Sequence, residues 1–522
     1  MTVETINVPH QAGVRRSPDT TPAPPVRPLW RHALWRAVVV PLTVLAPLVA
    51  LAPTADHRFN IYWHGGLFRD NPLRIVPHTL GSLDSYLGMG NFRPLGRMLE
   101  KSLDLAVFTI TDVTGLPANV SFRLVSFSAA VVLTVTAVLF AESFVSPGPL
   151  FRRPPSALAA TVPFAVGAGF IAAGVTSPAI LFGGLYLLSA ALVLGVGAAV
   201  CRVGPDTRIR WWLGLLLVVT GAALAVFNEI VYLALPFATA VVLLRGRAAP
   251  ALRVLGLLWL GFLPVFGAVR AVIYQNCAAG GCYVRSDINL SGAVLQTEPV
   301  RLVAWLPPLM WRFAVDGRPW LTGMVPVVAL LILLWLGWRA IRDLPKLSTV
   351  EPQTALRLAG AAAALLVLGA TLGSLNADVQ GIVAAGRIGQ GWRDTAVTAG
   401  AGALMGTALV HGGSAWHRVP GSRVLAGLIA VLAVAGALSA AANQRYATTM
   451  AGRAPFELAN RVAQEMANFD TSPAGDAHRC RLRTEFRALY PTLAFSLSRF
   501  DTSLNKASRQ LAGMPFCAGA TR

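Results

Sequence analysis

Apolar runs of about membrane thickness recur along most of this 522-residue chain. A helix needs about 20 mostly apolar residues to cross a bilayer. Runs that approach this length lie at 37–52, 120–141, 157–173, 178–200, 211–228, 230–244, 254–274, 320–338, 357–375, 395–411 and 424–442. Only 13% of the residues are charged, whereas soluble proteins carry about a quarter. The sequence therefore predicts an all-α polytopic membrane protein with about 11 transmembrane helices.

The positive charge of the chain predicts its orientation. The net charge of +20 comes mainly from arginines between the apolar runs, which is typical of contact with membrane lipids and not of nucleic-acid binding. Under the count above, the short arginine-containing loops share one side of the membrane, which the positive-inside rule makes cytoplasmic. We expect a bacterial plasma-membrane protein with a cytoplasmic N-terminus and an extracytoplasmic C-terminus.

Three parts follow from this pattern. Residues 1–36 are rich in Pro, Thr and Arg and are predicted to be a disordered cytoplasmic tail. Residues 37–442 form the transmembrane domain, and residues 443–522 form a small helical domain outside the membrane. The first outer loop, 54–119, contains a segment in which apolar residues recur at helical spacing from 95 to 110, opposite Arg97, Glu100, Lys101 and Asp104. This spacing predicts a helix that lies in the membrane interface.

Four cysteines are placed for disulfide formation. Cys277 and Cys282 share one predicted outer loop, and Cys480 and Cys517 lie in the C-terminal domain. Both pairs fall in the oxidising compartment under the predicted topology, so we expect two disulfide bonds. No His or further Cys pair stands near the first pair, and the sequence indicates no metal site and no cofactor.

The first outer loop also holds the ionisable residues that could carry chemistry. Asp56, Asp70 and His64 lie there with several arginines. A carboxylate beside cations could act as a general base on a hydroxyl while the cations hold a phosphate leaving group. The alternative is that Asp56 and Asp70 pair with Arg58 and Arg69 in a solvated loop.

Three more charged residues stand near span ends. Glu229 interrupts the apolar stretch from 211 to 244, so it marks either a tight outer turn or a site. Arg387 and Arg393 lie in a glycine-containing outer loop, where guanidinium groups suit phosphate, although an arginine near a span end is often an interfacial anchor.

The order of these features resembles the GT-C superfamily of membrane glycosyltransferases, and most closely the protein O-mannosyltransferases. Four stretches carry the resemblance: the outer loop after the first span, residues 70–73 (Asp-Asn-Pro-Leu), residues 91–95 (Asn-Phe-Arg-Pro-Leu) followed by 122–125 (Phe-Arg-Leu-Val), and residues 228–236, which open with Asn-Glu and end in Leu-Pro. The late loop at 385–387 is similar to the family's Glu-Arg segment, without its Glu. The family's acidic pair is replaced by Tyr-Trp-His at 62–64.

The resemblance implies sugar transfer with inversion from a polyprenyl-phosphate sugar to a cell-envelope acceptor on the outer face. Asp56 or Asp70 would deprotonate the acceptor. Arg93, Arg387 and Arg393 would hold the phosphate, and His64 and Glu229 would complete the binding site. Two alternatives remain open: a non-catalytic GT-C-like scaffold or sugar-lipid binder, which the missing acidic pair favours, and a lipid-linked glycan transporter.

Overall fold

The computed structural model describes residues 26–53, 56–146, 148–246, 249–278, 282, 288–414, 420–491 and 494–521. Across these residues the chain is helical, with 21 α-helices and several short 3-10 turns. The β-structure in this part of the chain is limited to two isolated bridges, Ser156 with Ser348 and Ile288 with Asn376. The all-α class predicted from the sequence is confirmed.

Every predicted apolar run overlaps a helix. The helices are α1 (Val26–Leu45), α6 (Ala118–Val145), α7 (Leu158–Ala168), α8 (Leu185–Cys201), α9 (Trp211–Ala225), α10 (Ala234–Arg245), α11 (Ala249–Ala278), α14 (Met324–Asp343), α15 (Pro352–Ser374), α17 (Thr395–Gly413) and α18 (Gly421–Ala451). Within the described ranges, six helical segments are long and apolar enough to cross a membrane, and three further apolar helices are shorter. These features are consistent with a polytopic membrane protein, while the count of about 11 spans stays a prediction.

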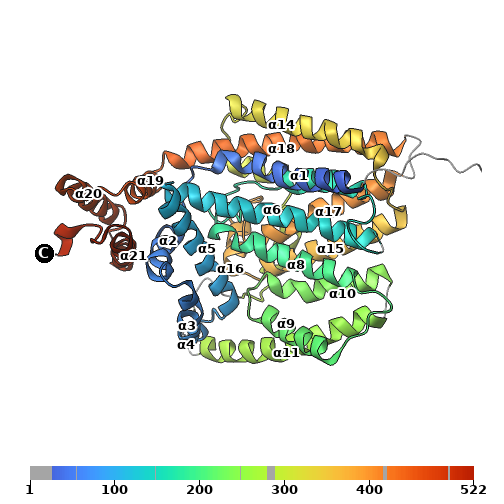
Figure 1. The fold of residues 1–522 in the computed structure, drawn as a ribbon, viewed down its shortest axis with the longest axis horizontal. Coiled ribbons are helices and arrows are strands. Elements are labelled where there is room, and N and C mark those ends of the chain that lie inside the picture. Colours follow the sequence, from blue (N-terminus) through green and yellow to red (C-terminus); the bar gives the residue numbers. More distant parts are fainter. Residues whose placement is uncertain are drawn as a thin grey trace, which may run out of the picture.

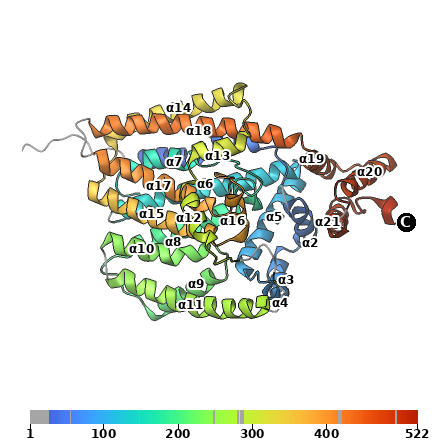
Figure 2. The ribbon, with the colours of Figure 1, turned by 180° about the vertical axis from the view of Figure 1, so that it is seen from behind.

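The apolar helices lie side by side in one bundle, with α1, α14 and α18 along one edge and α9 and α11 along the other (Figures 1 and 2). At one end of the bundle lie α2 (His57–Phe68), α5 (Pro94–Thr114) and the C-terminal helices α19 (Ala454–Ala467), α20 (Pro473–Leu489) and α21 (Ala494–Ala512). We call this the loop end. The short helices α3 (Ile75–Leu80) and α4 (Leu83–Gly88) complete the first loop there.

Small residues let neighbouring helices approach closely. A Cβ atom on Gly221 of α9 would lie 2.0 Å from the carbonyl oxygen of Leu258 in α11, and one on Gly261 of α11 would lie 1.9 Å from the carbonyl oxygen of Val218 in α9. Each helix therefore presents a glycine where the other's backbone passes. This is the packing expected of helices that associate in a membrane through small residues.

Polar side chains inside the bundle bind backbone groups that the helices leave open. Arg123 of α6 is fully buried, and its guanidinium donates to the carbonyl oxygens of Leu51 at 2.9 Å, Ala52 at 3.1 Å and Ile180 at 2.9 Å. These carbonyls belong to irregular segments after α1 and before α8. Non-helical backbone inside a membrane bundle needs such partners, since no water can replace them.

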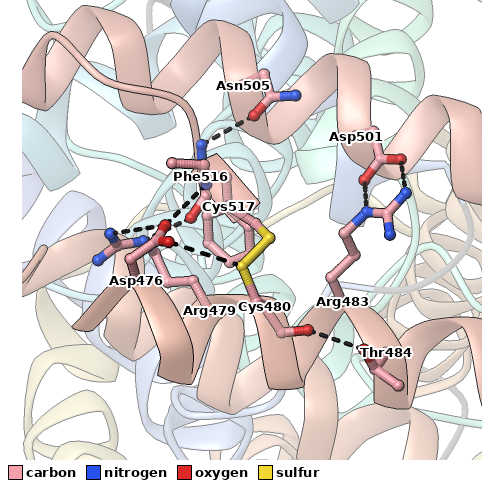
Figure 3. The surroundings of a disulfide bond; sticks show 10 residues. Asp476, Arg479, Cys480, Arg483, Thr484, Asp501, Asn505, Phe516 and Cys517 are labelled. Carbon is pink, nitrogen blue, oxygen red and sulfur yellow. Dashed lines mark hydrogen bonds and ion pairs between the residues drawn. A yellow bond between two sulfur atoms is a disulfide. The ribbon is translucent and has the colours of Figure 1, made fainter. Parts of the chain in front are cut away.

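The C-terminal helices form a small packed unit held by a disulfide (Figure 3). The Cys480–Cys517 bond joins α20 to the segment after α21, and Arg483 of α20 binds both carboxylate oxygens of Asp501 at 2.7 and 2.8 Å. The ring of Phe500 in α21 stacks on the ring of Phe486 in α20, at 4.5 Å between centroids. The second disulfide, Cys277–Cys282, is also present, so both predicted cysteine pairs are confirmed.

The structure differs from the sequence-based expectations in three places. Helix α1 begins at Val26, so residues 26–36 are helical and not part of a disordered tail; residues 1–25 lie outside the described ranges. Helix α18 runs without interruption to Ala451, past the predicted boundary at residue 442. The face of α5 that carries Glu100, Lys101 and Asp104 is buried in the protein, whereas an interfacial helix would turn its polar face to water.

Candidate active site

A cavity of about 600 Å³ opens at the loop end of the bundle. Four parts of the chain line it: the start of α2 with the residues just before it, the irregular segment before α8, the helix α16 (Ala377–Ala384) with the loop before α17, and the C-terminal helices. Its charged lining residues are Asp56, Arg58, Asp378 and Arg393. Aromatic rings of Phe182, Trp392, Phe456 and Tyr490 make up much of the rest. Carboxylates, guanidinium groups and aromatic faces in one cavity suit a polar ligand with a ring and an anionic group.

Phe182 enters this cavity from an unusual backbone conformation. Its φ is 61°, and Gly183 and Gly184, which follow it, also have positive φ values of 55° and 97°. A non-glycine residue rarely adopts this conformation, and such strain is often retained where a side chain must point into a site. The ring of Phe182 lies edge-on to the imidazole of His57, at 4.7 Å between centroids, and the Arg393 guanidinium lies 5.8 Å from its centroid.

Two histidines share one carboxylate between α2 and α5. Nδ1 of His57 lies 3.1 Å from Oδ1 of Asp104, and Nδ1 of His64 lies 2.8 Å from Oδ2 of the same residue. A carboxylate accepts hydrogen bonds, so both Nδ1 atoms donate and each Nε2 is left to exchange a proton. Nε2 of His57 is buried and has no hydrogen-bond partner among the described residues. Burial lowers the pKa of His57, but Asp104, with smaller effects from Glu100 and Asp56, outweighs burial and the pKa is raised overall.

Glu100 lies one turn before Asp104 on the same face of α5. It accepts a hydrogen bond from Arg97 at 2.9 Å, and its side chain is only 3% exposed. Burial raises the pKa of Glu100, but Arg97, His57 and then Arg93 outweigh burial and bring the pKa to about 2. Glu100 is therefore ionised inside the protein because positive groups surround it.

A second cluster places three guanidinium groups near one carboxylate. Arg93 donates to Glu229 at 3.4 Å. Burial raises the pKa of Glu229, but Arg93, Arg393 and Arg270 together lower it to about 2. The Glu229 side chain is 38% exposed, so this carboxylate is reachable from outside the protein core. Arg93 also lowers the pKa of Glu100, and the two clusters are thus electrostatically connected through this residue.

Local sequence explains how Arg93 reaches this position. Arg93 precedes Pro94, which begins α5 with the backbone angle that a first helical residue needs. The backbone N–H groups of Leu95 and Gly96 donate to the carbonyl oxygens of Val226 at 3.3 Å and Phe227 at 3.1 Å, just after α9. A Cβ on Gly96 would lie 2.3 Å from the Phe227 oxygen, so only glycine permits this approach. The start of α5 is thereby fixed beside Glu229.

Arg393 is held by a buried ion pair next to it in sequence. Arg301 of α12 (Ala293–Val303) binds Asp394 in a bidentate manner, at 2.9 Å to Oδ2 and 2.6 Å to Oδ1. Arg301 also donates to the carbonyl oxygen of Gln390 at 3.0 Å. Both partners of the pair have side chains that are 1% exposed. These three bonds fix the segment that carries Arg393, whose guanidinium lies 5.6 Å from the ring centroid of Tyr186.

The C-terminal helix α21 contacts both carboxylates that the sequence singles out as bases. Arg499 donates to Asp56 at 3.0 Å, and Gln510 donates to Asp70 at 2.6 Å. The alternative pairing with Arg58 and Arg69 is not observed: Arg69 pairs with Asp112, and Arg58 donates to the hydroxyl of Tyr490 at 2.6 Å. The two carboxylates flank opposite ends of α2 and are 14 positions apart in the sequence, so they are separated by about 21 Å along its axis.

The structure therefore brings some of the sequence-derived candidates together and separates others. Asp56 and Arg393 line the cavity, and Arg93 and Glu229 belong to the adjoining cluster. His64 belongs to the histidine pair. Asp70 and Arg387 are exposed and are not among the lining residues of the cavity. Glu229 lies in the turn between α9 and α10, as one sequence interpretation expects, and pairs with Arg93; its role in a site stays a prediction.

Sequence reasoning missed three contributors. Asp104 was assigned to the polar face of an interfacial helix, and Arg270 and Arg301 were not among the residues that the sequence singled out. The signal for Asp104 was present, because four ionisable residues on one face of a membrane-associated helix are costly unless they meet partners. Arg270 and Arg301 become recognisable only when their neighbours from other helices are known.

No protein-family model, curated protein or solved structure matches this chain, so these comparisons assign no family. In the part of the chain that the structure describes, no group of three or more His, Cys, Asp and Glu side chains is placed to hold a metal ion.

Proposed function

We propose that this protein is a membrane glycosyltransferase that transfers a sugar from a polyprenyl-phosphate donor to a hydroxyl acceptor at the loop end of the bundle. One observation carries the proposal: the Asp56 carboxylate and the Arg393 guanidinium line the same cavity. A base and a phosphate-binding cation on the walls of one cavity are what transfer from a phosphate-linked sugar requires.

The charge balance beside the cavity supports an anionic ligand. Three guanidinium groups, from Arg93, Arg270 and Arg393, act on the single carboxylate of Glu229. This leaves two positive charges in excess, and a phosphate monoester released from a sugar carries a charge near minus two at neutral pH. Arginine binds phosphate oxygens in a bidentate manner and keeps its charge when it is partly buried.

The proposed reaction is a single displacement. The acceptor oxygen attacks the anomeric carbon, and the bond from that carbon to the phosphate oxygen breaks. Asp56 takes the proton from the acceptor hydroxyl, and the polyprenyl phosphate leaves with the bonding electron pair, held by Arg393 and Arg93. Attack opposite to the leaving group inverts the anomeric centre. The aromatic rings that line the cavity would contact the sugar.

Release of polyprenyl phosphate tests the proposal. The purified protein is incubated with a panel of polyprenyl-phosphate sugars and total membrane glycolipid as acceptor. We expect Asp56→Asn to abolish release and Asp70→Asn, its matched control at the other end of α2, to retain it. Because Asp56→Asn also removes a partner of Arg499, the Arg499→Gln variant is measured in parallel and should remain active. Normal release by Asp56→Asn would overturn the assignment of the base.

A second function is favoured by the contacts of α21. Both candidate carboxylates are held by this helix, Asp56 through Arg499 and Asp70 through Gln510. A protein that binds a sugar lipid without turnover would use its carboxylates in this structural way. It would be stabilised by the donor lipid, and its melting temperature would rise, without releasing polyprenyl phosphate from any donor of the panel.

A further inference from the structure

The end of the bundle opposite to the loop end carries a second cavity, which the proposed function does not use. It has a volume of about 500 Å³ and is lined by Arg27, Trp30, Arg31, Leu34, Trp35, Val38 and Phe151. All of these residues except Phe151 belong to α1, whose N-terminal half extends before the first predicted span. We call it the α1 groove.

The lining of the α1 groove changes in character along the helix axis. Arg27 and Arg31 are one helical turn apart and lie on the same face. Leu34 and Trp35 follow on the next turn, and Val38 on the one after. Each residue advances about 1.5 Å along the helix axis. In this direction the lining changes from cationic to aromatic to aliphatic. A phospholipid that lies along the helix changes in the same order, from phosphate through the interface to the acyl chain.

The side wall of the groove is aromatic and well fixed. The indole N–H of Trp30 donates to the carbonyl oxygen of Arg153 at 2.8 Å. The Trp30 ring packs on Phe151, with 4.7 Å between centroids. Phe151 has a positive φ of 66°, an unusual value for a residue of this kind, and its ring is 50% exposed. The backbone thus holds an aromatic ring outward at the edge of the groove.

The two arginines are available to a ligand. Both are exposed, and neither forms an ion pair with an acidic side chain in the described ranges. The next arginine of the helix differs: Arg36 is buried and donates to Asp343 of α14 at 2.9 Å. One face of α1 thus uses its charge to join the bundle, while the other presents its charge to the surface beside a 54% exposed Trp35.

We propose that the α1 groove binds an anionic phospholipid of the adjacent membrane leaflet. The head-group phosphate lies between Arg27 and Arg31, and one acyl chain follows Leu34, Trp35 and Val38. An anionic lipid is favoured over a zwitterionic one because two guanidinium groups, neither of which has an acidic partner within the described ranges, meet its net negative charge. The groove is apolar beyond the arginines, so a soluble phosphate would leave most of its lining without a partner.

Lipid retention measured by native mass spectrometry tests this site. The full-length protein is extracted from nanodiscs that contain equal amounts of phosphatidylglycerol and phosphatidylcholine. We expect the wild type to retain phosphatidylglycerol preferentially. In Arg27→Gln/Arg31→Gln this preference should fall by about thirty-fold, because the variant loses the attraction that two arginines add near an anionic surface. Trp35→Ala should weaken retention of both lipids and keep the preference.

The matched control is Arg339→Gln/Arg342→Gln. These two exposed arginines lie near the same end on α14, over the rings of Trp335 and Trp338, and they do not line the groove. They should leave the preference unchanged. Equal retention by the wild type and the Arg27/Arg31 variant would overturn the proposal, as would an equal loss in the control. Displacement of the lipid by free glycerol phosphate would also overturn it, since the site would then recognise soluble phosphate. An unchanged melting temperature shows that each variant is folded.

Discussion

Two buried polar side chains inside the bundle, Arg123 and Asn443, differ from three at the loop end in how fully the protein satisfies them. In the bundle, Arg123 binds backbone carbonyls, and both ends of the Asn443 side-chain amide bind backbone groups of α1 and of the segment after α7. At the loop end, buried nitrogen atoms of His57, Arg93 and Arg393 have no hydrogen-bond partner in the described part of the chain.

The position beside a cavity, and not the lack of a partner alone, separates candidate functional groups from structural ones, because atoms of Arg36, Ser143 and Thr398 in the bundle also lack a partner among the described residues. A buried polar atom without a partner costs about 1–3 kcal/mol, so a protein retains several of them together only where another requirement outweighs that cost. Arg393 lines the cavity at the loop end, and Arg93 is connected to it through Glu229. We therefore expect substitutions in the bundle to reduce stability and substitutions at the loop end to reduce ligand binding.

The largest effect is expected for Arg123→Leu. Four backbone carbonyls would lose their partner, each at a cost of about 1–3 kcal/mol, and the irregular segments after α1 and before α8 would no longer be fixed. We expect little folded protein by size-exclusion chromatography and a strongly lowered melting temperature. The exposed Arg423 provides a control, since Arg423→Leu should leave the melting temperature nearly unchanged. A stable Arg123→Leu protein would show that the bundle does not depend on this residue.

Arg393→Gln should have the next largest effect, but on turnover. Loss of one preorganised positive group that stabilises the leaving phosphate costs about 2.7–4 kcal/mol, or roughly a hundred- to a thousand-fold in rate. The melting temperature should change little, because Arg393 lines a cavity. Arg387→Gln is the matched control in the same loop and should retain activity. If both variants retain full activity, the site does not use this loop.

Arg301→Lys should have a smaller effect on turnover. Lysine keeps the charge beside Asp394 but cannot form the bidentate pair or the bond to Gln390, so Arg393 would be less well placed. We expect turnover to fall by about ten-fold, which corresponds to roughly 1.4 kcal/mol, with a slightly lower melting temperature. The decrease should appear in kcat for donors that bind normally. Unchanged kcat would show that Arg301 has a structural role alone.

The smallest expected effect concerns pH. The pKa of Glu100 is about 2 in the folded protein and is near its ordinary value of 4.5 when unfolded. Glu100 therefore contributes stability that is present above pH 4.5 and is lost as the pH falls toward 2. Between pH 7 and pH 4 the loss is about 1 kcal/mol. Unfolding measurements over this range should show a shallower pH dependence for Glu100→Gln. An identical slope in both proteins would contradict the assignment.

Much of the helical architecture could be predicted from the sequence, because apolar runs and helical spacing are local signals. The spacing of apolar residues predicted α5, and the positions of the four cysteines predicted two disulfides, both of which are present. Spacing shows that α5 has two faces but not which neighbours cover each face, so its buried acidic residues were assigned to the surface. The contacts of Asp56 and Asp70 with α21 join residues more than 400 positions apart, and no local pattern predicts them.

The central claim is that the arginines at the loop end bind the phosphate of a polyprenyl-phosphate lipid. An experimental structure of the full chain with polyprenyl phosphate tests this claim most directly. We predict phosphate density within hydrogen-bond distance of Arg393 and Arg93, with the Glu229 carboxylate moved away from Arg93, and loss of that density in Arg393→Gln but not in Arg387→Gln. Phosphate density at another place on the bundle, or none at saturating lipid, would contradict the claim.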